Sequence, residues 1–184
     1  MKPCLFLALT IGLGPTACKK SPGPSLPAAT QEGKNTAGCL INGQPFVAKS
    51  YGGGVLNTAI PALQGGFAFD HSYHLAMHGQ LDGQGVEVML FLQGRQPGTY
   101  LLNQDTQYYP RGTPAYVLDH ATYTLASSQE VYVTNARHTG QVVLTAANVA
   151  QGLSAGTFDF TAVSTRDSTR TITITSGRFD RGGW

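Results

Sequence analysis

The feature that most constrains this fold is an alternation of apolar and polar residues with a period of two, which recurs from residue 38 to the end. Such a period places successive side chains on opposite faces of a β-strand. Turn-forming Gly, Asn, Asp and Pro interrupt the alternation about every 8–12 residues. The pattern predicts an all-β fold, an antiparallel β-sandwich of about nine or ten strands, with a β-barrel as the alternative.

Local signals refine this prediction. Asn42-Gly43 is a strong hairpin turn. The segment 86–92 is apolar on both faces and is expected in the middle of a sheet. Phe179 is out of parity with Ile172 and Ile174, so Gly177 is expected to mark a β-bulge. Strands are predicted at 39–41, 45–48, 67–77, 86–92, 99–102, 115–126, 131–134, 141–146, 157–163 and 171–175, with a short helical turn within 148–153.

The N-terminal residues 1–17 have the features of a lipoprotein signal peptide. Lys2 precedes an apolar run that ends near Gly14, which is shorter than the ~20 residues that cross a bilayer. Small residues then precede Cys18, whose sulfur is the expected site of lipidation. Pro15 stands where such signals usually have an aliphatic residue, and ordinary secretion is the alternative.

Residues 18–37 are predicted to be the lipidated cysteine and a flexible Pro-rich tether, and residues 38–184 a single β domain. The chain has a net charge of +2, but residues 38–184 contain eight basic and nine acidic residues. A near-neutral domain offers no basic surface, so no nucleic-acid partner is expected. Cys4 is lost with the signal, and Cys39 is expected to be a buried thiol. If Cys18 is not lipidated, a Cys18–Cys39 disulfide is the alternative.

Three segments carry a resemblance to a known family. GCLINGQPF (38–46), GTFDFTA (156–162) and ITITSGRFD (172–180) resemble the opening strand and closing hairpin of small β-rich lipoproteins of unknown function from Bacteroidota. The resemblance implies an architecture and a membrane-anchored location, and it brings no activity. Surface-exported lipoproteins of that group tend to have acidic residues after the lipidated cysteine, whereas this chain has Lys19 and Lys20. By resemblance, we expect an outer-membrane lipoprotein that faces the periplasm.

Two motifs suggest chemistry that the strand pattern disfavours. In H-x-x-H-x-x-x-H, His74 and His78 would lie about 13 Å apart on one face of a strand, and His71 would point to the other face. These three histidines therefore cannot hold one metal ion within a single strand, and a metal site would need His120 or His138 from another strand. Gly152–Gly156 matches the G-x-S-x-G of hydrolases, but a strand rather than a helix is predicted to follow it. No metal, cofactor or catalytic residue is therefore predicted.

The segment Asp105–Gly112 is the strongest candidate for binding. Tyr108 and Tyr109 offer rigid amphipathic faces, and Arg111 adds a planar set of donors. The sequence thus predicts a non-enzymatic, lipid-anchored envelope protein whose β domain binds a ligand or supports an assembly, with its molecular activity unassigned. In the binding version, a glycan or a peptide contacts Tyr108, Tyr109 and Arg111; otherwise these tyrosines cover the sheet without a ligand. Two alternatives are a serine hydrolase that uses Ser154 with His120 or His138 and an acid such as Asp119, and a barrel that carries a small apolar ligand.

Overall fold

The computed structural model describes residues 25–54, 57–67, 71–113 and 115–183. This part of the chain is all-β, as predicted, and contains eleven strands and no α-helix. No helix in it is long and apolar enough to span a bilayer. The strands are β1 (Thr36–Ile41), β2 (Gln44–Val47), β3 (Leu63–Gly66), β4 (Tyr73–Leu81), β5 (Gln84–Leu92), β6 (Gly98–Leu101), β7 (His120–Leu125), β8 (Glu130–Val133), β9 (Gly140–Asn148), β10 (Leu153–Ser164) and β11 (Thr171–Arg181).

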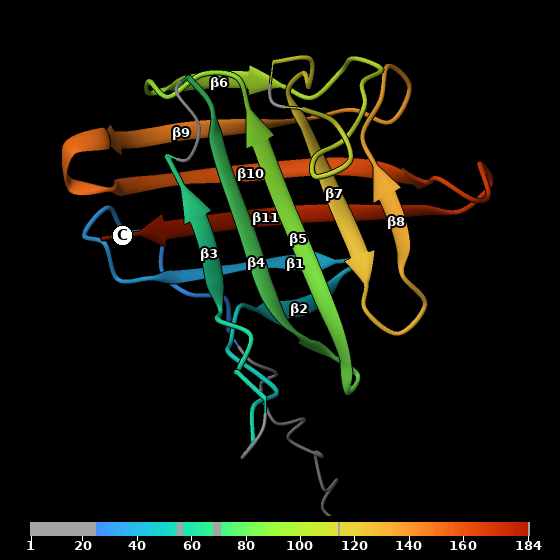
Figure 1. The fold of residues 1–184 in the computed structure, drawn as a ribbon, viewed down its shortest axis with the longest axis horizontal. Coiled ribbons are helices and arrows are strands. Elements are labelled where there is room, and N and C mark those ends of the chain that lie inside the picture. The colour runs from blue at the N-terminus through green and yellow to red at the C-terminus, as the bar shows by residue number, and fades with distance from the viewer. Residues whose placement is uncertain (1–24, 55–56, 68–70, 114, 184) are drawn as a thin grey trace, which may run out of the picture.

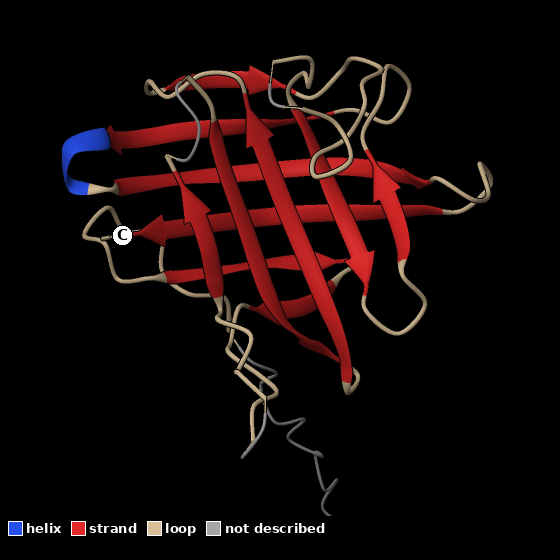
Figure 2. Ribbon diagram, viewed as in Figure 1, coloured by secondary structure: helices blue, strands red, loops and turns tan. Residues whose placement is uncertain are grey.

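The strands form a single curled antiparallel sheet in the order β2-β1-β11-β10-β8-β7-β5-β4-β3, with β9 and β6 added beside β10. In Figure 1, β3, β4, β5, β7 and β8 lie in front and cross the strands behind them at a steep angle. Figure 2 shows that strands make up almost the whole domain, with one short helical turn between β9 and β10. That turn, Val149–Gln151, is a 3₁₀ turn in the predicted segment 148–153.

Strand β10 joins the two halves of the sheet. Its first part pairs with β9, and Val163 and Ser164 at its end pair with β8 in the front layer. The opposite ends of the sheet also meet, because the Lys49 N–H beyond β2 donates to the His78 carbonyl of β4 at 2.9 Å. The fold is therefore a half-barrel, consistent with the predicted sandwich and with its barrel alternative.

Apolar side chains from both layers fill the space between them. Tyr73 of β4 stacks on Phe179 of β11 with ring centroids 6.0 Å apart, and Phe179 also contacts Phe158 of β10. Twenty-three buried residues form one continuous core cluster. Burial of this apolar surface is the main source of stability. Because side chains occupy the interior, the structure gives no support to the prediction of a barrel with an apolar ligand inside.

The two local backbone signals are confirmed. Asn42 and Gly43 have φ values of 47° and 81°, the left-handed pair that a tight hairpin requires. The pairing of β11 with β10 shifts between Phe158 and Phe160, so a β-bulge separates Ile174 from Gly177. Because of this bulge, Ile174 and Phe179 both point into the core although their spacing is odd.

Two predicted strands are wrong in their extent. The alternation at 67–77 is not one strand, because β3 ends at Gly66 and pairs antiparallel with β4, which begins only at Tyr73. The centroids of the Phe67 and Tyr73 rings lie 5.3 Å apart. The alternating apolar residues therefore pack in the same part of the core although they do not form one strand. The predicted strand 115–126 begins at His120 instead, since the preceding residues belong to a loop that covers the sheet.

The folded domain also begins before residue 38, where its boundary was predicted. Strand β1 starts at Thr36, and the arm before it is held by the buried carboxylate of Asp180 in β11. That carboxylate accepts hydrogen bonds from the Thr30 hydroxyl (2.5 Å), the Gly33 N–H (2.7 Å) and the Glu32 N–H (3.1 Å). Burial alone would raise the pKa of Asp180, but these hydrogen bonds outweigh it and lower the pKa.

Candidate functional site

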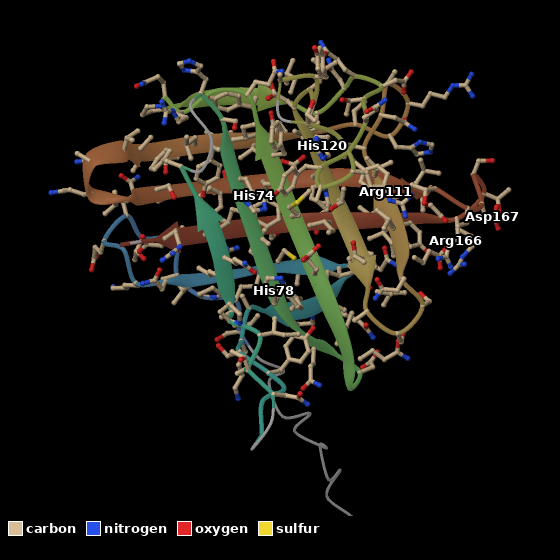
Figure 3. All side chains as sticks on the ribbon, in the orientation of Figure 1. His74, His78, Arg111, His120, Arg166 and Asp167 are labelled. Atoms are coloured by element: carbon tan, nitrogen blue, oxygen red, sulfur yellow. The ribbon has the colours of Figure 1, made fainter. Side chains whose placement is uncertain are left out.

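The candidate site is built on the outer face of the front layer, where β4, β5 and β7 lie side by side. Cross-strand pairing places His74, Phe91 and His120 in one row, since His74 pairs with Phe91 and Phe91 pairs with His120. The Tyr109 ring covers this row, 4.7 Å from the His74 ring and stacked at 5.9 Å on Phe91. Figure 3 shows His74 and His120 on this face of the sheet. The described part of the loop between β6 and β7, residues 102–113 and 115–119, is thereby anchored to the sheet, and we call it the covering loop.

His120 fixes the covering loop through both ring nitrogens. Its Nε2 accepts the Tyr109 N–H at 3.1 Å, and its Nδ1 lies 2.8 Å from the Leu118 carbonyl, to which it donates. This arrangement requires the neutral ring with the proton on Nδ1. The side chain is completely buried, and this burial lowers the pKa of His120 to about 4.

Tyr108, which is half-buried, and Arg111, which is exposed, lie close together in the same loop. The Arg111 guanidinium carbon lies 5.4 Å from the centre of the Tyr108 ring, within the range of a cation–π interaction. The Gly112 N–H donates to the Tyr108 carbonyl at 3.0 Å and closes the turn that brings them together. Tyr116, 79% exposed, lies further along the loop. We refer to Tyr108 and Arg111 as the Tyr–Arg pair; it offers an aromatic face and guanidinium donors to an acidic or hydroxyl-rich ligand.

The structure therefore separates the three predicted binding residues. It places Tyr108 and Arg111 together at the surface, whereas Tyr109 packs against the sheet and anchors the loop. The peptide bond between Tyr109 and Pro110 is cis.

Ser154 does not have the geometry of a catalytic serine. It is completely buried in β10, and its hydroxyl lies 3.0 Å from the Tyr73 hydroxyl inside the core. His120 lies on the outer face of β7 with both ring nitrogens engaged, and His138 bonds to Asn135 in another loop. The structure gives no support to a hydrolase site at Ser154, because the G-x-S-x-G motif lies at the start of strand β10 and not at a sharp turn before a helix.

The histidines of the H-x-x-H-x-x-x-H motif also have separate roles. His78 lies 3.0 Å from the Glu87 carboxylate through Nε2 and 3.0 Å from the Pro61 carbonyl through Nδ1. His74 lies further along β4 beneath Tyr109, and His71 is exposed before the strand begins. No three His, Cys, Asp or Glu side chains of the described residues are placed to hold a metal ion.

One surface groove was not predicted. It lies beside the end of β4, has a volume of about 460 Å³, and is lined by Val47, Lys49, Ser50, Tyr51, Gly52 and Gln80. These residues come from the end of β2, the segment after it and the distant β4. No sequence motif links them, and only the contact between β2 and β4 brings them together.

The predicted anchor, Cys18, lies outside the described residues. Cys39 is buried in β1, and burial raises the pKa of its thiol to about 12. It is the only free cysteine among the residues that the structure describes.

Comparison with known proteins identifies the family of this fold. Residues 62–182 match the model of a domain of unknown function (DUF6252), which covers β3 to β11 and therefore both the covering loop and the closing hairpin. The chain belongs to this family. The match begins after the predicted opening motif at 38–46, so β1 and β2 lie outside it. No curated protein and no solved structure matches the chain significantly.

Proposed function

We propose that this DUF6252 protein is a non-enzymatic binding protein of the cell envelope. Its β domain is tethered through lipidated Cys18 to the periplasmic face of the outer membrane and recognises a peptide or glycan that carries a carboxylate. The observation that carries the proposal is the Tyr–Arg pair, an exposed Arg111 beside a half-buried Tyr108, on a loop already fixed by Tyr109 and His120. A guanidinium and an aromatic ring held in place before the ligand arrives lose little entropy on binding.

Charge supports a carboxylate-bearing ligand. The Arg111 guanidinium is exposed, and no carboxylate of the described residues lies within ion-pair distance of it. Arginine binds carboxylates with two parallel hydrogen bonds, and a nearby aromatic ring can cover the apolar face of a sugar or a side chain. Such a pair favours ligands that combine a carboxylate with a ring or an alkyl group.

The test is co-sedimentation of the full-length protein with purified peptidoglycan sacculi, which present both peptide carboxylates and glycan. We expect the native protein to sediment with the sacculi, and Arg111→Gln to weaken binding about tenfold or more, because a hydrogen bond to a charged group contributes about 1.5–3 kcal/mol. Arg137→Gln is the matched control, since Arg137 is also exposed but lies in a different loop. Equal binding by both variants, or no binding by the native protein, would contradict the proposal.

The anchor and the lack of catalysis have their own tests. Mass spectrometry of the mature protein should find the chain starting at an acylated Cys18, and Cys18→Ser should move the protein from the membrane to the soluble fraction. A fluorophosphonate probe should leave Ser154 unlabelled, because its hydroxyl is buried against Tyr73. Labelling of Ser154 in the folded protein would contradict the non-enzymatic function.

A further inference from the structure

The groove beside the end of β4 combines a fixed backbone with unused polar side chains. The Lys49 N–H donates to the His78 carbonyl at 2.9 Å, and the Ser50 hydroxyl accepts the Ala62 N–H at 3.1 Å. Tyr51 exchanges two backbone hydrogen bonds with Ile60, of 2.9 and 3.2 Å. The segment 49–51 is thus tied on one side to β4 and on the other to the chain that leads into β3. Its side chains project from a backbone that is set in place.

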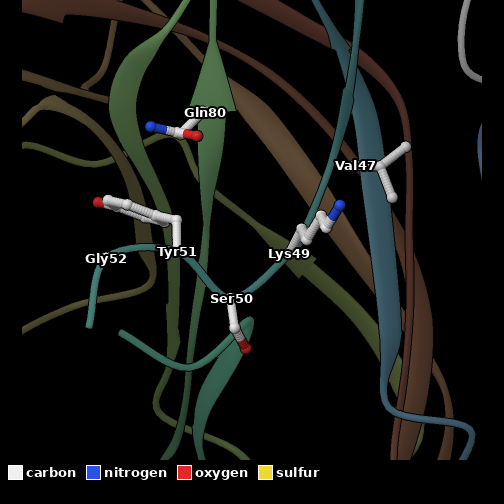
Figure 4. Close-up of a pocket in the computed structure, with 6 residues that line it drawn as sticks. All are labelled: Val47, Lys49, Ser50, Tyr51, Gly52 and Gln80. Carbon is white, nitrogen blue, oxygen red and sulfur yellow. The ribbon is translucent and has the colours of Figure 1, made fainter. Parts of the chain in front are cut away.

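Three side chains of different chemistry line the groove. Figure 4 shows the Tyr51 ring and the Gln80 amide on one side and Lys49 and Val47 on the other, with the Lys49 chain directed towards Val47. The Tyr51 hydroxyl lies over Gly85 of β5, where a Cβ would come within 2.7 Å of it, so the absence of a side chain there makes room for the ring. Gly85 therefore lets the Tyr51 ring pack closely against β5 at the edge of the groove.

Two polar side chains of the groove, Lys49 and Gln80, are unpaired among the described residues. Across the described residues, no hydrogen bond or ion pair engages the Lys49 ammonium or the Gln80 amide. Tyr51 likewise has no ring contact among the described aromatic side chains. Around about 460 Å³, the Lys49 ammonium offers an ion pair, and the Gln80 amide offers a donor and an acceptor. The Tyr51 ring offers a stacking surface. The volume lies in the range of small-ligand sites.

We propose that this groove is a binding site for an acidic saccharide. The sugar ring lies on the face of Tyr51, its hydroxyls bond to the Gln80 amide, and its carboxylate pairs with Lys49. An acidic saccharide satisfies all three groups at once, whereas a simple anion leaves the ring and the amide unused. The site is distinct from the Tyr–Arg pair, because Gln80 lies six residues along β4 from His74, roughly 20 Å in an extended strand.

The test is a titration of the isotopically labelled full-length protein with D-glucuronate, followed by the backbone and side-chain amide resonances. We expect saturable shifts at Lys49, Tyr51 and the Gln80 side chain, with an affinity near the millimolar range that is typical of small polar ligands. D-glucose should bind about tenfold more weakly or worse because it lacks the carboxylate. Acetate should not reproduce the shifts at Tyr51 and Gln80.

Variants distinguish the groove from general charge attraction. Lys49→Gln and Gln80→Ala should each weaken D-glucuronate binding, Lys49→Gln by about tenfold or more. Lys34→Gln is the matched control, because it removes an exposed lysine that pairs with Glu32 outside the groove. All three are surface changes that leave the core intact.

Three results would overturn the site: no saturable shift with D-glucuronate, equal shifts with acetate, or unchanged binding by both groove variants. The amide resonances of Lys49, Tyr51 and Gln80 are followed separately from those of Tyr108 and Arg111, so binding in the groove is distinguished from binding at the Tyr–Arg pair in the same titration. If the Tyr–Arg pair does not bind sacculi, the groove proposal still stands. If the groove does not bind D-glucuronate, the proposal for the Tyr–Arg pair still stands.

Discussion

The buried ring of His120 makes the stability of the domain depend on pH in a way that can be calculated. In the folded protein its neutral form is required, because Nε2 accepts the Tyr109 N–H while Nδ1 donates to Leu118. Burial lowers the pKa of His120 from 6.5 to about 4. At about 1.4 kcal/mol per pKa unit, this difference corresponds to about 3 kcal/mol of folding free energy.

The sign follows from the direction of the pKa change. Because the folded protein disfavours the imidazolium, the contribution of His120 is fully present above pH 6.5 and is lost as the pH falls towards about 4. About 2 kcal/mol should be lost by pH 5 and about 3 kcal/mol by pH 4. His74 and Asp119 also have shifted pKa values, lowered and raised in that order by burial, so the native protein alone does not isolate His120.

The assay is urea denaturation of the native protein and of His120→Gln at a series of pH values from 7 to 4. A glutamine amide can donate to Leu118 and accept from Tyr109 without titrating, so it keeps both hydrogen bonds at every pH. We expect the native protein to lose about 3 kcal/mol relative to His120→Gln over this range. Amide exchange at Tyr109 should accelerate in parallel in the native protein alone. If the two stability curves stay parallel from pH 7 to 4, the assignment of a buried, neutral His120 is wrong.

Three further predictions concern the rest of the domain. Asp180→Asn weakens the hydrogen bonds that hold the N-terminal arm, so we expect it to lower the free energy of unfolding, measured by urea denaturation, by about 3 kcal/mol. Asp159→Asn, at an exposed site, should lower it little, and equal losses in the two variants would contradict the role of Asp180. Gly156→Ala places a Cβ against the Val143 carbonyl oxygen of β9 and should lower the free energy of unfolding by about 1–3 kcal/mol. Gly54→Ala is the control, because its Cβ meets no atom within 4 Å and the change should be near neutral. Unchanged stability of Gly156→Ala would refute the close packing of β9 and β10. Cys39 should resist iodoacetamide in the folded protein and react in urea, as detected by mass spectrometry, and rapid labelling without urea would show that the thiol is accessible.

The parts of the fold that could be predicted from the sequence are those set by local chemistry. Asn42-Gly43 specifies its hairpin because both residues tolerate a positive φ, and Gly177 marks a bulge because the parity of the surrounding apolar residues changes there. The run 67–77 misled for a related reason. Phe67 and Tyr73 both face the core, and alternation alone does not show that one strand ends before Phe67 and that the next begins at Tyr73.

The candidate site was only partly predictable because its parts meet through the tertiary fold. Tyr108 and Arg111 stand close in sequence, so their pairing could be expected, but nothing local shows that Tyr109 turns away from them. Its orientation depends on His74 and Phe91, which only the pairing of β4 with β5 places together. The groove at Lys49 and Gln80 depends even more on long-range contacts, and it could not be predicted from the chain alone.

The double-sided apolar character of β5 links the fold to the proposed recognition surface. Leu90 faces the core, while Met89 and Phe91 point to the outer face, and all three are buried. A strand of this kind has two apolar surfaces to remove from water, and the second layer of the sheet can cover only one of them. The covering loop buries the other through Tyr109, so the loop is ordered by the folding of the domain and not by a ligand. The entropy of ordering Tyr108 and Arg111 is therefore spent during folding, which leaves more of their interaction energy for binding. The run 86–92, which indicated only a central strand, thus also explains why a polar loop lies fixed across the sheet.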